Sequence, residues 1–370
     1  MSQAPAPLVP DYEGACLTGV VAAVLGRHHE SQPPWLPGPV VGAEQVVLLV
    51  LDGLGWEQLA ARPHLAPTLT AMEGGPISTV VPSTTSTALT SLTTGAPPAR
   101  HGVVGYRLKA PNGEVLNVLR WSTPTGDARD RVAPDAIQPL EPFLGAKPGV
   151  VTKSEFGETG FTRAHLAGCD FQGWRYPSSL VERTRALIAE GRPFVYAYYP
   201  GIDAVAHEHG FGPLYDAELA FADRVVADLL AVLPPGVAVL VVADHGQVDV
   251  GERMIPLDRD LTGLTVLLSG EGRFRWLHAR PGLTRRLADV ARDRYGDVAW
   301  VRTRDELLAD GWLGGQPSPA VAARLGDVAL VAHADVAFVD PADTGTYSLR
   351  CRHGSLTSAE MLVPLVAARA

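Results

Sequence analysis

Residues Gln45–Gly55, QVVLLVLDGLG, join a strand-length apolar run to an aspartate and two glycines. An apolar run of this length is typical of a central parallel strand that is covered on both faces. Asp52 follows the run directly, and open α/β sheets bind their ligands at the carboxyl ends of their strands. An aspartate here also fits as a cap for the helix expected from Trp56, so this stretch alone leaves both interpretations open.

The same pattern occurs twice more along the chain. PFVYAYYP at 193–200 leads into Asp203, and VAVLVVA at 237–243 leads into Asp244. Three apolar strands that each run into an aspartate are poorly explained as three helix caps. They predict an α/β fold with a mostly parallel central sheet and carboxylates gathered at one edge.

Composition restricts the class of protein. The chain has 370 residues, of which 46% are hydrophobic and 19% charged, and its net charge is -9. These values fit a folded α/β enzyme and argue against a partner that is a nucleic acid polymer, since binding to phosphate backbones requires clustered cations. No apolar run is long enough to span a membrane. Three scattered cysteines without a CxxC pair, and no basic segment before the first apolar stretch, predict a cytoplasmic protein.

The domain organisation is predicted from changes in composition and in the length of apolar runs along the chain. Residues 1–40 are expected to form a helix, Tyr12–His28, and a Pro-rich linker that pack on the core. The catalytic domain is expected at 41–254 and 336–370, with a small α+β region inserted at 255–335. A final strand at Met361–Leu365 should rejoin the main sheet, although Pro364 limits its pairing to one side or to a strand end.

Residues 78–106, STVVPSTTSTALTSLTTGAPPARHGVVGY, are unusually rich in hydroxyl groups. Ser83 or Thr84 is expected to cap a helix that ends at Gly95. Such a helix would direct a hydroxyl nucleophile and free N–H groups at one point in front of its first turn. The alternative is a well-capped helix without any chemical role.

Asp52, Asp203 and Asp244 combine with three histidines. His207 follows Asp203 at i+4, His245 follows Asp244 directly, and His353 lies in a polar turn. Three carboxylates and three imidazoles suit two divalent metal ions, with zinc favoured and manganese or iron as alternatives. Two such ions supply +4 against -3 from the carboxylates, so the pocket would keep about one positive charge for an anionic substrate.

These motifs, taken in order, resemble the alkaline phosphatase superfamily, above all its nucleotide pyrophosphatase/phosphodiesterase branch. The resemblance implies an alkaline-phosphatase-like three-layer α/β/α sandwich. It implies Thr85, ten residues before Gly95, as the nucleophile, with Thr84 as the rival. It also implies two groups of metal ligands. One group is Asp203, His207 and His353, and the other is Asp52, Thr85, Asp244 and His245.

The sequence departs from the family pattern near the expected substrate. Tyr106 stands where the branch usually has an asparagine that holds a phosphoryl oxygen, and a tyrosine hydroxyl would change the pocket. Lys153 is a candidate contact for the substrate anion or a solvated surface lysine. Four aromatic residues are candidates for stacking on a nucleobase or for ordinary core packing: Trp174, Tyr176, Tyr198 and Tyr199. His209 is an ambiguous neighbour of the preferred ligand His207.

The resemblance implies a two-step hydrolysis through a phospho-threonine intermediate. We expect a phosphodiesterase or nucleotide pyrophosphatase that acts on a small phosphate ester or nucleotide. A phosphonate hydrolase of the phosphonoacetate type or a phosphomonoesterase on the same scaffold is the alternative. A metal-stabilised binding protein in which the threonine never reacts is the third hypothesis. The inserted region 255–335 is expected to contribute to a lid over the metals.

Overall fold

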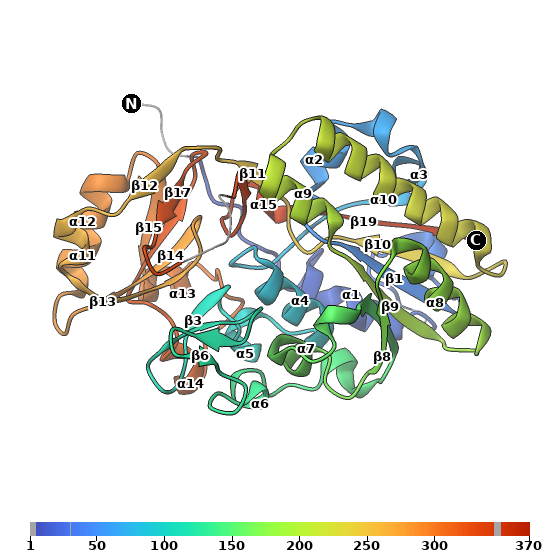
Figure 1. Cartoon of the computed structure of the whole chain (residues 1–370), viewed down its shortest axis with the longest axis horizontal. Helices are drawn as coiled ribbons and strands as arrows, with labels where there is room; N and C mark the ends of the chain where they lie inside the picture. The colour runs from blue at the N-terminus through green and yellow to red at the C-terminus, as the bar shows by residue number, and fades with distance from the viewer. Residues whose placement is uncertain (1–4, 30, 344–348) are drawn as a thin grey trace.

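The computed structural model describes residues 5–29, 31–343 and 349–370. A seven-stranded sheet runs through the larger part of the molecule (Figure 1). Its strands in spatial order are β2 (Glu73–Ser78), β19 (Leu362–Arg369), β10 (Ala238–Val242), β1 (Val46–Leu51), β9 (Phe194–Tyr199), β7 (Gly149–Lys153) and β8 (Asp170–Trp174). The five strands from β10 to β8 pair in parallel, whereas β19 is antiparallel to both of its neighbours. The predicted α/β fold with a mostly parallel sheet is therefore confirmed.

Helices cover both faces of this sheet, which explains its apolar strands. Every residue of β1, β9 and β10 is buried, as expected for strands packed between two layers. On one side α10 (Pro213–Val232) packs against α3 (Pro67–Ala71), α8 (Pro177–Ala189) and α9 (Gly201–His209). On the other side α1 (Leu17–Leu25) packs against α4 (Thr85–Thr94), and α4 contacts α7 (Gly160–His165). The result is the expected three-layer sandwich.

The strand β19 lies inside the sheet, between β2 and β10. Its pairing with β10 ends at Leu365, whereas its pairing with β2 continues past Pro364 to Leu362. Proline has no N–H to donate to a neighbouring strand, so it is tolerated where the ladder is one-sided. The predicted limit on the pairing of Pro364 is confirmed.

Strand direction brings distant parts of the chain to one edge of the sheet. The carboxyl ends of β1, β9 and β10 are neighbours because β1 pairs with both other strands. Because β19 is antiparallel to β10, its amino end lies at this same edge. The carboxyl end of β2 lies there too, since β2 is antiparallel to β19. The loops after β1, β9, β10 and β2 and the loop before β19 therefore converge.

The N-terminal helix is shorter than predicted. The sequence pattern predicted Tyr12–His28, but α1 begins at Leu17 and ends at Leu25. Turns occupy the preceding residues, where the N–H of Gly14 bonds to the carbonyl oxygen of Asp11 and that of Cys16 to Gly14. Helical periodicity does not detect such turns, because they are fixed by local main-chain hydrogen bonds.

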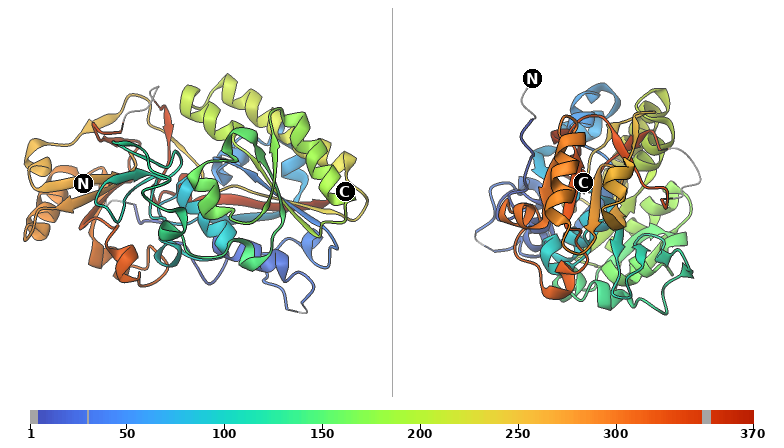
Figure 2. Two further views of the ribbon diagram at one scale, coloured as in Figure 1. Left: turned by 60° about the horizontal axis from the view of Figure 1, so that its bottom comes forward. Right: turned by 90° about the vertical axis from the view of Figure 1, so that its left-hand side faces the viewer.

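The inserted region forms a second, smaller sheet at one end of the molecule (Figure 2). Its strands in spatial order are β13 (Thr265–Gly270), β14 (Phe274–Ala279), β16 (Val328–Ala332) and β15 (Ala299–Thr303), and α12 (Thr284–Tyr295) packs on them. The sequence pattern predicts short strands at 264–268, 273–278 and 298–301 around a helix at 283–295, which correspond to β13, β14, β15 and α12, whereas β16 was missed. A small antiparallel sheet was also missed. Its strands are β3 (Arg107–Lys109), β4 (Val115–Asn117), β5 (Ser122–Thr123) and β6 (Gly126–Asp127).

A helix that spans a membrane must be both long and apolar. None of the helices within the described ranges meets both requirements.

Candidate active site

Asp52, Thr85, Asp244 and His245 form the first of two groups of polar side chains at the converging loops. The Nε2 atom of His245 lies 3.1 Å from the Thr85 hydroxyl oxygen, 3.5 Å from Oδ1 of Asp52 and 3.4 Å from Oδ2 of Asp244. Oδ1 of Asp52 and Oδ2 of Asp244 are buried and have no hydrogen-bond partner. Two unpartnered carboxylate oxygens around an imidazole nitrogen are the kind of donor set that divalent cations bind.

Asp203, His207 and His353 form the second group. Nε2 of His207 lies 3.2 Å from Oδ1 of Asp203 and 3.3 Å from Nε2 of His353. Asp203 and His207 share one face of α9, as their i, i+4 spacing predicts. The two groups adjoin, because the rings of His245 and His353 stack with centroids 3.6 Å apart.

Each of the three histidines is oriented by a main-chain carbonyl group. Nδ1 of His207 lies 2.6 Å from the oxygen of Cys351, that of His353 3.0 Å from Ser83, and that of His245 3.0 Å from Gly246. Because a carbonyl oxygen only accepts hydrogen bonds, each Nδ1 carries the proton. In the neutral form of each ring the lone pair is then on Nε2 and faces the two groups, which is the tautomer that a metal ligand needs.

Burial and mutual repulsion favour the neutral forms of several of these groups. Burial raises the pKa of Asp52, and the nearby carboxylates of Asp244 and Asp203 raise it further. Burial also raises the pKa of Asp244. The pKa of His353 is well below its ordinary value because of burial and because His245 and His207 lie beside it. Three crowded carboxylates of this kind would be stabilised by cations, and the residues present thus fit the two metal ions expected from the sequence.

Backbone geometry after β1 permits the close approach of the loops. Gly53 has a φ of +75°, and a Cβ atom there would lie 2.9 Å from the Cα of Asp203. The N–H of Gly53 donates to Oδ1 of Asp244, and the N–H of Asp203 donates to the carbonyl oxygen of Asp52. Hydrogen bonds from Gly53 and to Asp52 thus hold the ends of the three central strands together.

Thr85 and Thr84 differ in what their side chains contact. Thr84 is the N-cap residue of α4 by its backbone conformation, and Thr85 is the first residue of the helix. Thr84 lies beside the carboxyl group of Glu271, whereas the hydroxyl of Thr85 faces His245. Of the two candidates for the nucleophile, Thr85 is the one that contacts the first group.

An apolar cavity of about 230 Å³ opens beside Asp52, Thr85 and Asp203. Apolar and hydroxyl side chains make up most of its wall. The other lining residues are Leu89, Leu119, Thr152, Phe156, Thr159, Phe161, Thr162, His165, Leu166, Tyr196, Tyr198, Pro200 and Ala204. Burial lowers the pKa of His165 to about 4, so this side chain is neutral near pH 7. Neither lysine nor arginine occurs among these described lining residues.

The candidate substrate contacts lie in different surroundings. Tyr106 does not line the cavity, and its hydroxyl accepts a hydrogen bond from the Asn117 amide at 2.5 Å. Lys153 is paired with Glu155 at 2.7 Å, and its ammonium group lies over the ring of Phe156. His209 is largely exposed beside Glu208.

Of the four aromatic candidates, only Tyr198 lines the cavity, and its hydroxyl donates to Oδ2 of Asp52. Trp174 stacks on Tyr199 in the core, and Tyr176 is exposed.

Sequence reasoning missed two polar residues that contact the site. The Gln247 amide donates to Oδ1 of Asp203 at 3.1 Å. The carboxyl group of Glu271 lies next to Thr84, the residue before Thr85. Gln247 had a local signal, since it follows His245 by two residues in the same loop. Glu271 had none, because it reaches the site from the inserted region.

Comparison with known proteins identifies the family. Residues 46–356 match the type I phosphodiesterase / nucleotide pyrophosphatase family. The chain belongs to this family. As a type I phosphodiesterase / nucleotide pyrophosphatase family member it is a hydrolase of phosphoric esters, which confirms the predicted enzyme class and the resemblance to the alkaline phosphatase superfamily. No curated protein matches the sequence at a significant level.

Solved structures show the same fold at low sequence identity. Murine ectonucleotide pyrophosphatase/phosphodiesterase 5 superposes with a TM-score of 0.66 at 16% identity, over 87% of each chain. Phosphonoacetate hydrolase from Sinorhizobium meliloti, in complex with phosphonoformate, superposes with a TM-score of 0.64 at 18% identity, over 92% of each chain. At these identities the likeness supports the fold of this family member and leaves its substrate open.

Proposed function

We propose that this family member is a phosphodiesterase that requires two divalent metal ions, zinc by ligand preference, and acts through a phospho-threonine intermediate. One ion would be held by Asp203, His207 and His353, and the other by Asp52, Thr85, Asp244 and His245. The observation that carries the proposal is the contact of the Thr85 hydroxyl with His245 between two unpartnered carboxylate oxygens. Bound divalent cations would offset the negative charge of the phosphoryl oxygens and favour the ionised form of the Thr85 oxygen.

In the proposed reaction the Thr85 oxygen is the nucleophile and the first turn of α4 binds the phosphoryl oxygens. The Thr85 hydroxyl gives up its proton and its oxygen attacks phosphorus in line. A bond from Thr85 to phosphorus forms, the bond to the leaving oxygen breaks, and the leaving group departs as an alcohol that has taken up a proton from solvent. Water then cleaves the phospho-threonine and restores the hydroxyl group. Thr85 is the first residue of α4, so main-chain N–H groups of the first turn are available to the phosphoryl oxygens.

The cavity favours a diester with an uncharged second substituent. It lies directly beside Thr85 and Asp52 and is walled mainly by apolar side chains, so an organic group on phosphorus would be removed from water there. A phosphonate that carries a carboxylate, such as phosphonoacetate, would meet no cation among the described lining residues. Hydrolysis of phosphonoacetate is therefore the second candidate, supported by the fold of the relative that is named for it.

Three substitutions test the nucleophile. Thr85→Ala should lower the rate on an aryl phosphodiester by about a thousandfold or more, because removal of a nucleophile eliminates the covalent route. Thr85→Ser should keep measurable activity, and Thr84→Ala is the control for the neighbouring hydroxyl. Equal rates for wild type and Thr85→Ala would remove Thr85 from the mechanism.

Metal and substrate are tested separately. Chelation should abolish activity and added zinc should restore it. Parallel assays on the aryl diester, its monoester and phosphonoacetate distinguish the proposed activity from the alternatives.

The three cysteines are unpaired, which supports the proposed cytoplasmic location.

A further inference from the structure

The turn between β13 and β14 extends from the inserted region into the catalytic domain. Arg273, in this turn, is fully buried, and so is its partner Glu360. Nε and Nη2 of Arg273 each lie 2.8 Å from one carboxylate oxygen of Glu360. Nη1 donates to the carbonyl oxygens of Ala334 and Val336 at 2.8 Å. A two-pronged contact of this kind fixes both the position and the rotation of the carboxylate.

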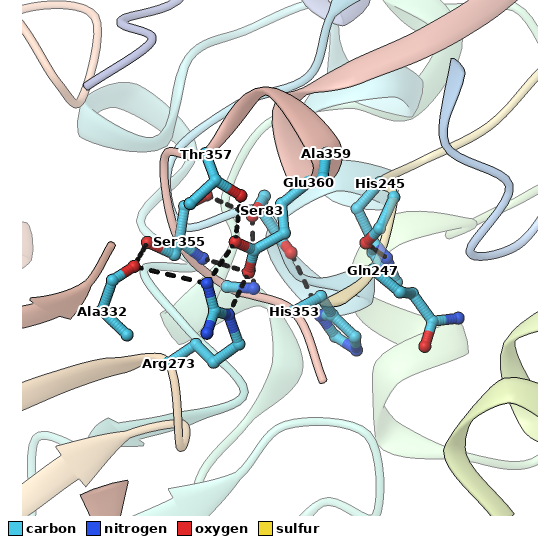
Figure 3. A network of polar contacts seen from close by, with 12 residues as sticks. Ser83, His245, Gln247, Arg273, Ala332, His353, Ser355, Thr357, Ala359 and Glu360 are labelled. Atoms are coloured by element: carbon cyan, nitrogen blue, oxygen red, sulfur yellow. Dashed lines mark hydrogen bonds and ion pairs between the residues drawn. The ribbon is translucent and has the colours of Figure 1, made fainter. Parts of the chain in front are cut away.

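Glu360 in turn holds the two loops that carry His353 and His245 (Figure 3). Its side chain accepts hydrogen bonds from the N–H of Ser355 at 3.0 Å and from the hydroxyl of Thr357 at 2.5 Å. Its main-chain oxygen accepts from the N–H of Gly246, the residue after His245, at 2.9 Å. One residue therefore contacts both loops.

The chain of contacts continues to the His353 ring. The Ser83 hydroxyl donates to the carbonyl oxygen of Ser355 at 2.6 Å and accepts from the N–H of Gly354 at 3.2 Å. The carbonyl oxygen of Ser83 lies 3.0 Å from Nδ1 of His353. Because this carbonyl group orients the ring, displacement of the Ser355 segment would turn Nε2 of His353 away from Asp203 and His207.

We propose that Arg273 is a positioning residue for the metal ligands His353 and His245, and that it acts through Glu360. The inference rests on the proposed metal site. It means that the inserted region helps to orient the metal ligands, in addition to any role as a lid. A buried ion pair is not in itself a source of stability, since two apolar residues can often replace it without loss. A role in positioning would account for this ion pair in a fully buried place.

Metal affinity measured by competition with a chromogenic zinc chelator tests the proposal. Arg273→Met should weaken zinc binding about 10- to 100-fold, the usual effect when a group that orients a metal ligand is lost. Arg107→Met is the matched control. Arg107 pairs with Asp340 at 2.5 Å, and both side chains are nearly buried, but Asp340 bonds to Arg107, Arg275 and Ala342 rather than to residues 353–360. The control should lose thermal stability and keep its zinc affinity within about twofold.

A double variant covers the case in which Arg273→Met does not fold. Arg273→Met with Glu360→Gln leaves no unpaired buried charge and keeps an acceptor for Ser355, so it should fold and still bind zinc about 10- to 100-fold more weakly. Wild-type zinc affinity in the folded variant, with a loss of melting temperature like that of Arg107→Met, would show a purely structural pair and overturn the inference. A wild-type protein that binds no zinc would instead refute the proposed function, and the inference with it.

Discussion

Glu271 is a buried carboxyl group whose replacement by glutamine should change how the free energy of unfolding depends on pH. Burial raises its pKa from an ordinary 4.5 to about 8, although the nearby Thr84, the hydrogen bond from the N–H of Tyr106 and the charge of Arg275 act in the opposite direction. The folded protein therefore keeps a proton on Glu271 at pH values where the unfolded chain has lost it.

The sign and size of the effect follow from proton linkage. Below about pH 4.5 both states hold the proton, and the stabilisation from the neutral acid is fully present. Between about pH 4.5 and 8 only the folded state holds it, so the free energy of unfolding falls as the pH rises. Each pH unit costs about 1.4 kcal/mol, and the shift of about 3.5 units sets an upper limit of about 5 kcal/mol.

Urea unfolding at pH 5 to 8, with a chelator present to exclude metal linkage, measures this dependence. Glu271→Gln keeps the shape of the side chain, an acceptor for the Tyr106 N–H and a partner for Thr84. The wild-type free energy of unfolding should fall by about 1.4 kcal/mol more per pH unit than that of the variant. Glu57→Gln, at an exposed position of α2 (Trp56–Ala60), is the control and should keep the wild-type slope. Parallel slopes for wild type and Glu271→Gln would refute the assignment of a neutral buried acid.

Two further substitutions test the loop after β1 and the cavity. Gly53→Ala should weaken zinc binding and hydrolysis about tenfold or more, because its Cβ would lie 2.9 Å from the Cα of Asp203. Gly42→Ala, with a similar φ of +68° and open space around it, should show only the backbone cost of about 1 kcal/mol in a thermal melt. Equal losses would exclude the contact as the cause. Leu119→Trp, at a half-buried position of the cavity wall, should raise the KM for a bulky aryl diester several-fold and leave that for a small dialkyl diester unchanged. Leu214→Trp, on an exposed position of α10, is its control, and an unchanged KM for both diesters would remove the cavity from substrate binding.

Local pattern predicted the parts of the fold in which neighbouring residues act together. The apolar runs before Asp52, Asp203 and Asp244 identified β1, β9 and β10, because a strand buried on both faces leaves no polar position in its sequence. The i, i+4 spacing of Asp203 and His207 placed both on one face of α9. Their proximity to His353 followed from strand order and from the resemblance to a family.

Contacts between distant segments were beyond such reasoning. Arg273 and Glu360 are 87 positions apart and meet because a hairpin of the inserted region reaches α15 (Ser358–Met361), the short helix before β19. The cavity combines residues of β7, α4 and α7 with loop residues such as Leu119, and none of these segments carries a repeating pattern that marks a binding site. The expected lid role and the domain boundaries at 255 and 335 stay predictions.

The interior position of β19 has a consequence for how the enzyme is made. Residues 362–369 fill the place between β10 and β2, and β2 leads directly to Thr85. During translation, β1, β9 and β10 leave the ribosome before this strand, because they precede it in the chain. Within the sheet, β2 is connected to the parallel strands through β19. Nascent chains that lack these residues should therefore be inactive, because β2 then has no neighbour in the sheet.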